Sequence, residues 1–267
     1  MQITRRFAWI TFTAFVAVQA SLFCAAMLRA QTAAPRAPSA GADSVLTLER
    51  IFNSGEFAAR HVSSIRWTAD GKGYTELERA TGAHGGRDLV RYDVVTGKRE
   101  VVVSAERLVM PGGDTLIEIE GYQWSADGKR LLIFTNAQRV WREDTRGDYW
   151  VIDVASGPPR KLGGSAAAPS TLMFAKFSPD GGRIAYVRAN NLYVEDATTG
   201  AITPLTTDGS HTIINGTFDW VYEEELNLRD GFRWSPDGKR IAYWQLDDSG
   251  VGNFLLIDDT DSLYSYT

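Results

Sequence analysis

The chain has 267 residues, of which 44% are hydrophobic and 23% are charged, and its formal net charge is -5. This apolar content is sufficient for a packed core and excludes a disordered chain. No run of basic residues occurs, so we exclude nucleic acid as a partner, because phosphate contacts need clustered Lys and Arg. The many aromatic residues (8 Trp, 10 Tyr and 12 Phe), together with 25 Gly, favour an all-β fold.

The first thirty residues predict an export signal. The basic pair Arg5 and Arg6 precedes an uncharged run over residues 7–28, and Ala30 offers a small residue for cleavage. We therefore expect a signal helix within residues 1–30 and an exported protein, either periplasmic or secreted. The alternative is an uncleaved membrane anchor, because the uncharged run nearly spans a bilayer core of about 30 Å.

Residues 31–45, rich in Ala, Pro, Ser and Gly, are predicted to be a flexible linker. The only cysteine is Cys24, inside the uncharged run, so a cleaved chain would have no disulfide and no cysteine-based site. The histidines His61, His84 and His211 are scattered along the chain. We interpret His84 and His211 as surface residues, and we expect neither a metal site nor a cofactor.

One sequence unit recurs four times, at intervals of 57, 53 and 57 residues. WTADGKGYTEL begins at Trp67, WSADGKRLLIFT at Trp124, FSPDGGRIAYVR at Phe177 and WSPDGKRIAYWQ at Trp234. In each copy an aromatic residue ends a strand, and Asp-Gly forms a tight turn in which Gly supplies a positive φ. Alternating apolar residues then form the returning strand, so each copy predicts a β-hairpin.

A weaker second hairpin follows in three copies, starting at Leu89, Tyr149 and Asn191. Two hairpins per period make a four-stranded unit, which is the content of a propeller blade. We therefore predict that residues 46–267 form an incomplete β-propeller of about four four-stranded blades. The alternative is a β-sandwich whose turns resemble one another by chance. The last blade is expected to reach its third strand in FLLIDD, which starts at Phe254.

A propeller closes by packing its last blade against its first, which hides the edges of both sheets. About four blades would leave apolar faces uncovered. We expect the chain to be a fragment of a longer protein; the alternative is that a partner covers the open side.

An acidic segment interrupts the strand pattern of the fourth repeat. Its notable residues are Asp219, Trp220, Tyr222, Glu223, Glu224 and Glu225. We predict a turn of helix with Asp219 as its N-cap. Because successive helical residues point about 100° apart, two of the glutamates can face one pocket while the third faces away. Adjacent carboxylates repel each other, so we expect them to receive a cation such as a protonated amine. The alternative is a solvated acidic loop.

The sequence DWVYEEE from Asp219 to Glu225 resembles the same motif of the dipeptidyl peptidase IV family, and the resemblance extends over residues 46–267. It implies that Glu224 and Glu225 bind the free N-terminus of a peptide, with the other residues of the motif in support. Arg142, in a Trp-Arg step before a Tyr-rich strand, matches the family arginine that holds a substrate carbonyl. The alternative for this arginine is a salt bridge to Glu143 or Asp144.

The resemblance implies a serine exopeptidase that removes dipeptides, with proline or alanine favoured as the second residue. Its partners would be peptides with a free N-terminus, the remaining blades and a C-terminal α/β-hydrolase domain, and it allows a homodimer of the full-length protein. No Gly-x-Ser-x-Gly elbow occurs in these 267 residues. We expect no catalytic residue in this chain, no turnover by the chain alone, and weaker amine binding at acid pH. The alternative is a non-enzymatic secreted propeller that binds a peptide or protein.

Overall fold

The computed structural model describes residues 46–58, 65–82, 85–258, 260 and 265–266. The chain divides into two compact units, Met1–His61 and Val62–Thr267. The predicted signal helix or anchor within residues 1–30 and the predicted linker over 31–45 lie outside the described residues, as do His61 and His84.

The first unit contains one described helix, α2 (Leu48–Phe52). Its N-cap Thr47 accepts a hydrogen bond from the backbone N–H of Arg50 at 3.2 Å through its hydroxyl oxygen. The helix buries none of its residues and belongs to no blade. Among the helices that the structure describes, none is both long enough and apolar enough to cross a membrane.

The second unit begins with three four-stranded antiparallel blades, so the predicted propeller repeat is confirmed. The first blade contains β1 (Arg66–Trp67), β2 (Gly73–Arg79), β3 (Arg87–Asp93) and β4 (Arg99–Val103). The second contains β5 (Gly121–Trp124), β6 (Arg130–Val140), β7 (Glu143–Asp153) and β8 (Arg160–Lys161). The third contains β9 (Leu172–Phe177), β10 (Arg183–Arg188), β11 (Asn191–Asp196) and β12 (Ile202–Pro204). Two short 3-10 helices, η2 (Ala105–Arg107) and η3 (Gly164–Ala166), lie in connecting segments.

The second and third blades are joined into one eight-stranded sheet. The junction is a short pairing of β7 with β9, in which Arg146 faces Met173 and Gly147 faces Leu172. It forms because β6 and β7 are each 11 residues long and extend beyond the shorter strands of their blade. This extension carries the β6–β7 hairpin tip towards the helix of the acidic segment.

The fourth repeat is less regular than the first three. Its predicted hairpin is present as β14 (Phe232–Trp234) paired with β15 (Ile241–Tyr243), and β16 (Gln245–Asp247) pairs with β13 (Ile213–Asn215). The predicted third strand FLLIDD does not join this blade. Within it only β17 (Ile257–Asp258) is extended, and it pairs with β18 (Ser265–Tyr266). Such a local pairing closes only a short loop, so it costs less chain entropy than a distant one.

The four repeats share one turn chemistry, which explains why they were visible in the sequence. The glycines Gly71, Gly128, Gly181 and Gly238 all have φ between 65° and 69°, a conformation that other residues adopt rarely. The Ser or Thr three positions earlier accepts a hydrogen bond from each glycine N–H through its backbone carbonyl, at 2.8 to 2.9 Å. Its hydroxyl also donates to the Asp of the turn. Each turn is therefore fixed locally, before any blade packs on another.

The core lies between successive blades. Along β6, Leu131 and Ile133 pack with the first blade, whereas Leu132 packs with the third blade against Phe177 and Ile184. A third cluster joins the third and fourth blades around Val187 and Phe232. This alternation follows from the two-residue period of a strand. Burying each large aliphatic side chain contributes about 1.5–3 kcal/mol, so packing between blades stabilises the unit.

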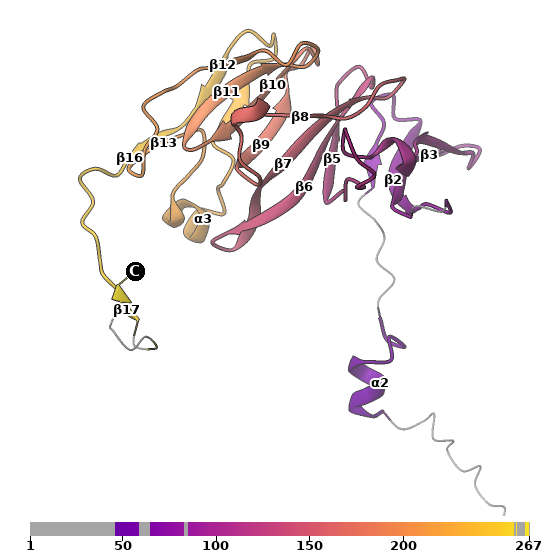
Figure 1. Cartoon of the computed structure of the whole chain (residues 1–267), viewed down its shortest axis with the longest axis horizontal. Coiled ribbons are helices and arrows are strands. Elements are labelled where there is room, and N and C mark those ends of the chain that lie inside the picture. The colour runs from indigo at the N-terminus through magenta and orange to yellow at the C-terminus, as the bar shows by residue number, and fades with distance from the viewer. Residues whose placement is uncertain (1–45, 59–64, 83–84, 259, 261–264, 267) are drawn as a thin grey trace, which may run out of the picture. The chain divides into compact units, whose positions relative to one another are not determined.

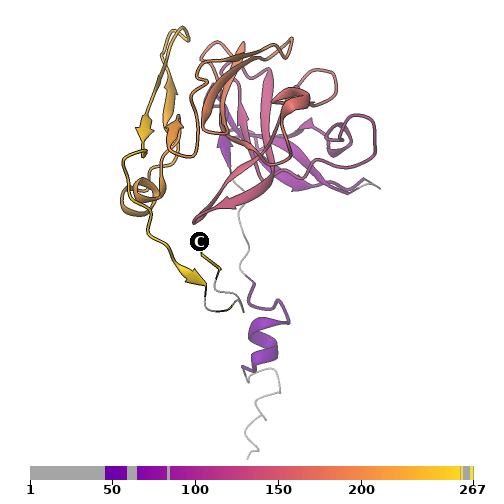
Figure 2. The ribbon, with the colours of Figure 1, turned by 60° about the vertical axis from the view of Figure 1, so that its left-hand side comes forward.

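The α-helix α3 (Trp220–Leu226) lies beside the tip of the β6–β7 hairpin (Figure 1). Figure 2 shows the same neighbourhood from a second direction. The blades thus position two segments that are distant in the sequence next to each other.

A substitution at Gly147 tests how closely the β6–β7 hairpin is packed. A Cβ at this position would lie 2.3 Å from Cε2 of Phe134 and 2.8 Å from the carbonyl oxygen of Thr135. We expect Gly147→Ala to lower the free energy of unfolding by about 1–3 kcal/mol, because the backbone must shift. Urea unfolding measures this change. Gly250→Ala, where no atom lies within 4 Å of the added Cβ, is the control; equal midpoints for the two variants would contradict the packing.

Candidate functional site

The site begins with α3, which the sequence predicted. Asp219 is the N-cap, and its Oδ1 accepts a hydrogen bond from the backbone N–H of Tyr222 at 3.0 Å. The rings of Phe218 and Tyr222 stack with centroids 5.2 Å apart, which attaches the helix to the preceding segment. The helix ends at Asn227, which adopts the left-handed conformation with φ of 55°. The predicted helical turn and its N-cap are confirmed.

The second element is the two-residue turn that joins β6 to β7. It consists of Trp141 and Arg142, and Trp141 has a φ of 54°. A bulky residue seldom adopts this left-handed conformation, so surrounding contacts must hold it. One such contact is a hydrogen bond in which the backbone N–H of Arg142 donates to Oε1 of Glu223 at 3.3 Å.

Arg142 and Glu224 form a bidentate ion pair. The guanidinium donates from Nε to Oε2 and from Nη2 to Oε1 of the carboxylate. The Arg142 side chain is 66% exposed and that of Glu224 is 22% exposed. The hydrogen bond to Glu224 raises the pKa of Arg142 above its ordinary value. The alternative pairing of Arg142 with Glu143 or Asp144 is therefore wrong, and Glu143 pairs with Arg229 at 3.1 Å instead.

Glu223 is the buried member of the glutamate run. Its side chain is only 3% exposed, and its Oε1 lies 3.5 Å from Nε of Arg229. Arg229 is also held by Oδ1 of Asn227 at 2.7 Å. A buried carboxylate is costly unless it is paired and hydrogen-bonded, and here both conditions are met. Glu223 therefore joins the helix, the β6–β7 turn and the segment between α3 and β14 that contains Arg229.

Glu225 is exposed, and among the residues that the structure describes it has no hydrogen bond or ion pair. Trp220 is 50% exposed on the same helix, while Tyr222 is half-buried. The three consecutive glutamates thus have three environments: buried, paired and open. The expectation that two of the glutamates face one pocket is wrong, because only Glu223 lines the adjoining cavity.

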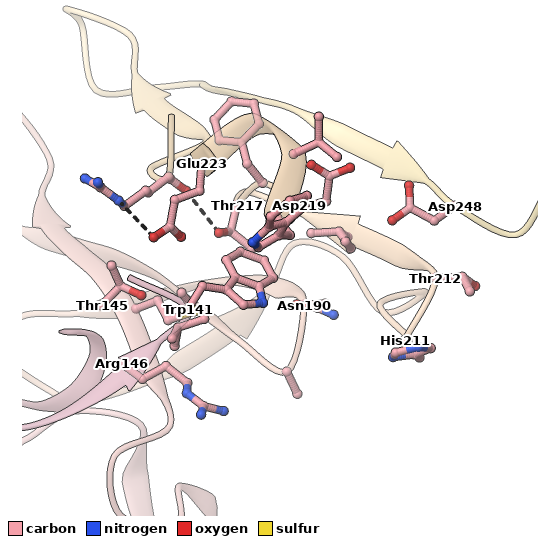
Figure 3. Close-up of a pocket in the computed structure, with 18 of the residues that line it drawn as sticks. Trp141, Thr145, Arg146, Asn190, His211, Thr212, Thr217, Asp219, Glu223 and Asp248 are labelled. Carbon is pink, nitrogen blue, oxygen red and sulfur yellow. Dashed lines mark hydrogen bonds and ion pairs between the residues drawn. The ribbon is translucent and has the colours of Figure 1, made fainter. Parts of the chain in front are cut away.

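A cavity of about 690 Å³ adjoins the site. Its walls include Trp141, Asp219, Trp220, Glu223 and Arg229, but Arg142, Glu224 and Glu225 are not among its lining residues. Figure 3 shows the Trp141 indole in this pocket, with Glu223 on one side and His211 and Asp248 on the other.

Two contributors were missed in the sequence. Arg229 carries no local signal, since it is a single arginine after the helix, and only its contact with Glu223 gives it a role. His211 is exposed as expected, but it also lines the cavity. Within the described part of the chain, no group of His, Cys, Asp and Glu side chains could hold a metal ion.

The comparisons with known proteins agree on one family. Residues 125–267 match the family model of the dipeptidyl peptidase IV (DPP IV) N-terminal region. Dipeptidyl aminopeptidase B of Saccharomyces cerevisiae is 38% identical over 153 residues, which cover 55% of this chain and 18% of the yeast protein. Dipeptidyl-aminopeptidase B of Aspergillus niger is 27% identical over 217 residues, which cover 78% of this chain and 24% of that protein.

A solved structure supports the same assignment. The crystal structure of dipeptidyl peptidase 4 from Porphyromonas gingivalis superimposes with a TM-score of 0.68 at 31% sequence identity, over 82% of this chain and 30% of that one. The chain thus spans less than a third of the length of these relatives. With the repeated blades and the family match taken together, the chain belongs to the dipeptidyl peptidase IV N-terminal region family, and its fold is part of a β-propeller.

Proposed function

We propose that this chain is the N-terminal propeller portion of an exported dipeptidyl peptidase IV-like serine exopeptidase. In this proposal Glu224 and Glu225, assisted by Arg142, bind the free N-terminus of a peptide. The observation that carries it is the meeting of Arg142 with Glu224, two residues separated by 82 positions in the sequence. A glutamate run without this partner would be only a solvated acidic helix.

The charges around α3 suit an ammonium group. The carboxylates of Asp219, Glu223, Glu224 and Glu225 outnumber the guanidinium groups of Arg142 and Arg229 nearby. An ammonium has three donors, so in this proposal it bridges the carboxylates of Glu224 and Glu225 by charge-assisted hydrogen bonds. Glu225 needs no rearrangement to accept, because it has no partner among the described residues.

The guanidinium of Arg142 retains a donor for the same ligand. It uses Nε and Nη2 on Glu224, and its Nη1 donates to no described residue. A peptide whose ammonium lies at Glu224 and Glu225 could therefore place a backbone carbonyl at Nη1. Two fixed contacts would define both the position and the direction of the peptide.

The role of this chain would be positioning, and bond cleavage would belong to an α/β-hydrolase domain. Holding the ammonium fixes how many residues precede the scissile bond, which lowers the entropic part of the barrier. The Gly-x-Ser-x-Gly elbow of such a domain does not occur in these 267 residues. Export, to the periplasm or outside the cell, rests on the sequence of residues 1–30, with residues 7–28 as the segment that could anchor the protein.

A secreted propeller that binds peptides without cleaving them is the second candidate. The observation that favours it is that the same ammonium site needs no catalytic group. A coding sequence that continues past Thr267 into further blades and a Gly-x-Ser-x-Gly elbow supports the exopeptidase. A stop codon there, together with soluble purified protein, supports the binding module.

Glu225→Gln tests the ammonium site directly. We expect the affinity for the tripeptide Ala-Pro-Ala to fall by about 10- to 100-fold, because a charge-assisted hydrogen bond is lost. Isothermal titration calorimetry on the purified chain measures the change. Glu118→Gln, which removes the charge of an exposed glutamate outside the site, is the matched control. Equal binding of the N-acetylated tripeptide to the unaltered chain would contradict recognition of a free amine.

Glu223 should behave differently from its neighbours because its carboxylate is buried. We expect Glu223→Ala to lower the free energy of unfolding by about 1–3 kcal/mol, since it leaves the Arg142 N–H without its acceptor and removes the carboxylate 3.5 Å from Nε of Arg229. Glu223→Gln keeps an acceptor oxygen and should cost less, while Glu225→Ala should leave stability nearly unchanged. Chemical denaturation of the three variants gives the order. If Glu223→Ala were as stable as Glu225→Ala, the anchoring role of Glu223 would be wrong.

A further inference from the structure

One strand of the third blade is attached to both elements of the candidate site. The strand is β9, which pairs with β7, the second strand of the hairpin that carries Arg142. Further along β9, Lys176 reaches the segment that follows α3 and contains Arg229. The position of the hairpin relative to this segment therefore depends on contacts made by a single strand.

The ammonium of Lys176 makes three contacts with the start of the fourth blade. Its Nζ donates to the carboxylate oxygens of Asp230 and, at 3.0 Å, to the carbonyl oxygen of Phe232. It also lies 3.8 Å from the centroid of the Phe232 ring, within the range of a cation–π interaction. The backbone carbonyl of the same lysine accepts a hydrogen bond from Nε1 of Trp234 at 3.3 Å. One residue thus fixes residues 230–234 against the third blade.

Asp230 lies at the base of the loop that bears α3. Its backbone forms an antiparallel bridge with that of Thr217, shortly before the helix. The Thr217 hydroxyl also donates to the carbonyl oxygen of Arg229 at 3.0 Å. The two ends of the loop are therefore joined, and Lys176 holds them at Asp230. From this base the side chain of Arg229 extends to Glu223.

The charge of Lys176 does not serve global stability. The side chain is only 16% exposed, and burial lowers its pKa from 10.5 to about 8, although the charge of Asp230 opposes the shift. The folded chain therefore holds this proton less tightly than the unfolded chain does, so at neutral pH the charge itself does not raise the free energy of unfolding. A buried charge of this kind can instead select one arrangement of the chain.

We propose that Lys176 is a positioning residue for the ammonium site. By holding Asp230, it places Arg229 beside Glu223. That contact in turn keeps the Glu223 carboxylate within reach of the backbone N–H of Arg142. Each step is a direct contact or a neighbour in the chain, so both sides of the site are biased by one element. The inference rests on the peptide-binding function proposed above, but the contacts that it concerns exist without a peptide.

Hydrogen–deuterium exchange of the Arg142 amide, followed by NMR on the purified full chain without peptide, tests this role. We expect Lys176→Met to raise the exchange rate of this amide about fivefold or more relative to the amides of β10, because the N–H loses its acceptor more often. Asp230→Asn, which removes the other charge of the pair, should have the same effect. Lys98→Met makes the same change at an exposed lysine of the first blade and is the control.

A double variant identifies the route of the effect. If Lys176 acts through Glu223, Lys176→Met should not increase exchange at Arg142 any further in a chain that already carries Glu223→Ala. Exchange at Arg142 that stays unchanged in both Lys176→Met and Asp230→Asn overturns the inference. An increase of the same size in the amides of β10, or one that persists in full in the Glu223→Ala chain, also overturns it.

Calorimetry with the tripeptide Ala-Pro-Ala then measures the consequence for binding. We expect Lys176→Met to weaken the affinity about 3- to 10-fold, because the glutamates and the arginine are held less firmly. Unchanged affinity in a variant whose Arg142 amide exchanges faster contradicts the positioning role. If the unaltered chain bound no peptide, the proposed function would be wrong, and the exchange measurements alone would still decide whether Lys176 positions Glu223 and Arg142.

Discussion

The buried carboxylate of Glu223 holds together two segments that are 81 residues apart in the sequence. It accepts a hydrogen bond from the backbone N–H of Arg142 and lies beside the guanidinium of Arg229. Because it stabilises the turn in which Trp141 has a positive φ, it also directs the Arg142 side chain to Glu224. The ammonium site that we propose on Glu224 and Glu225 is therefore only as ordered as this contact.

The blades provide the rigid frame for that contact. The long strands β6 and β7 bring the Trp141–Arg142 turn to α3, and the pairing of β7 with β9 fixes the hairpin against the third blade. In many proteins the functional residues lie on connecting segments, while the sheets supply a rigid scaffold. In this unit the helix and the turn supply the charges, and the packing between blades keeps them in place.

The parts that the sequence predicted are those that depend on local chemistry. The four turns are closed by their own Ser or Thr, Asp and Gly, and α3 begins at its own N-cap, so both are visible in a few residues. The environments of the glutamates were not predictable, because Arg142 and Arg229 reach them through the fold. The FLLIDD strand was wrongly placed for a related reason: a short run of apolar residues predicts a strand but not its partner.

A double-mutant cycle on the Arg142–Glu224 pair tests this account most directly. The affinities of the unaltered chain, Arg142→Ala, Glu224→Gln and the double variant for a peptide with a free N-terminus would be measured by calorimetry. For each variant the fold-loss in peptide affinity is compared with the unaltered chain. We predict that the fold-loss of the double variant differs from the product of the two single fold-losses by a factor of about five or more, because the two side chains act as one unit. Independent, multiplicative losses would show that the pair is only a surface salt bridge and would contradict the proposed site.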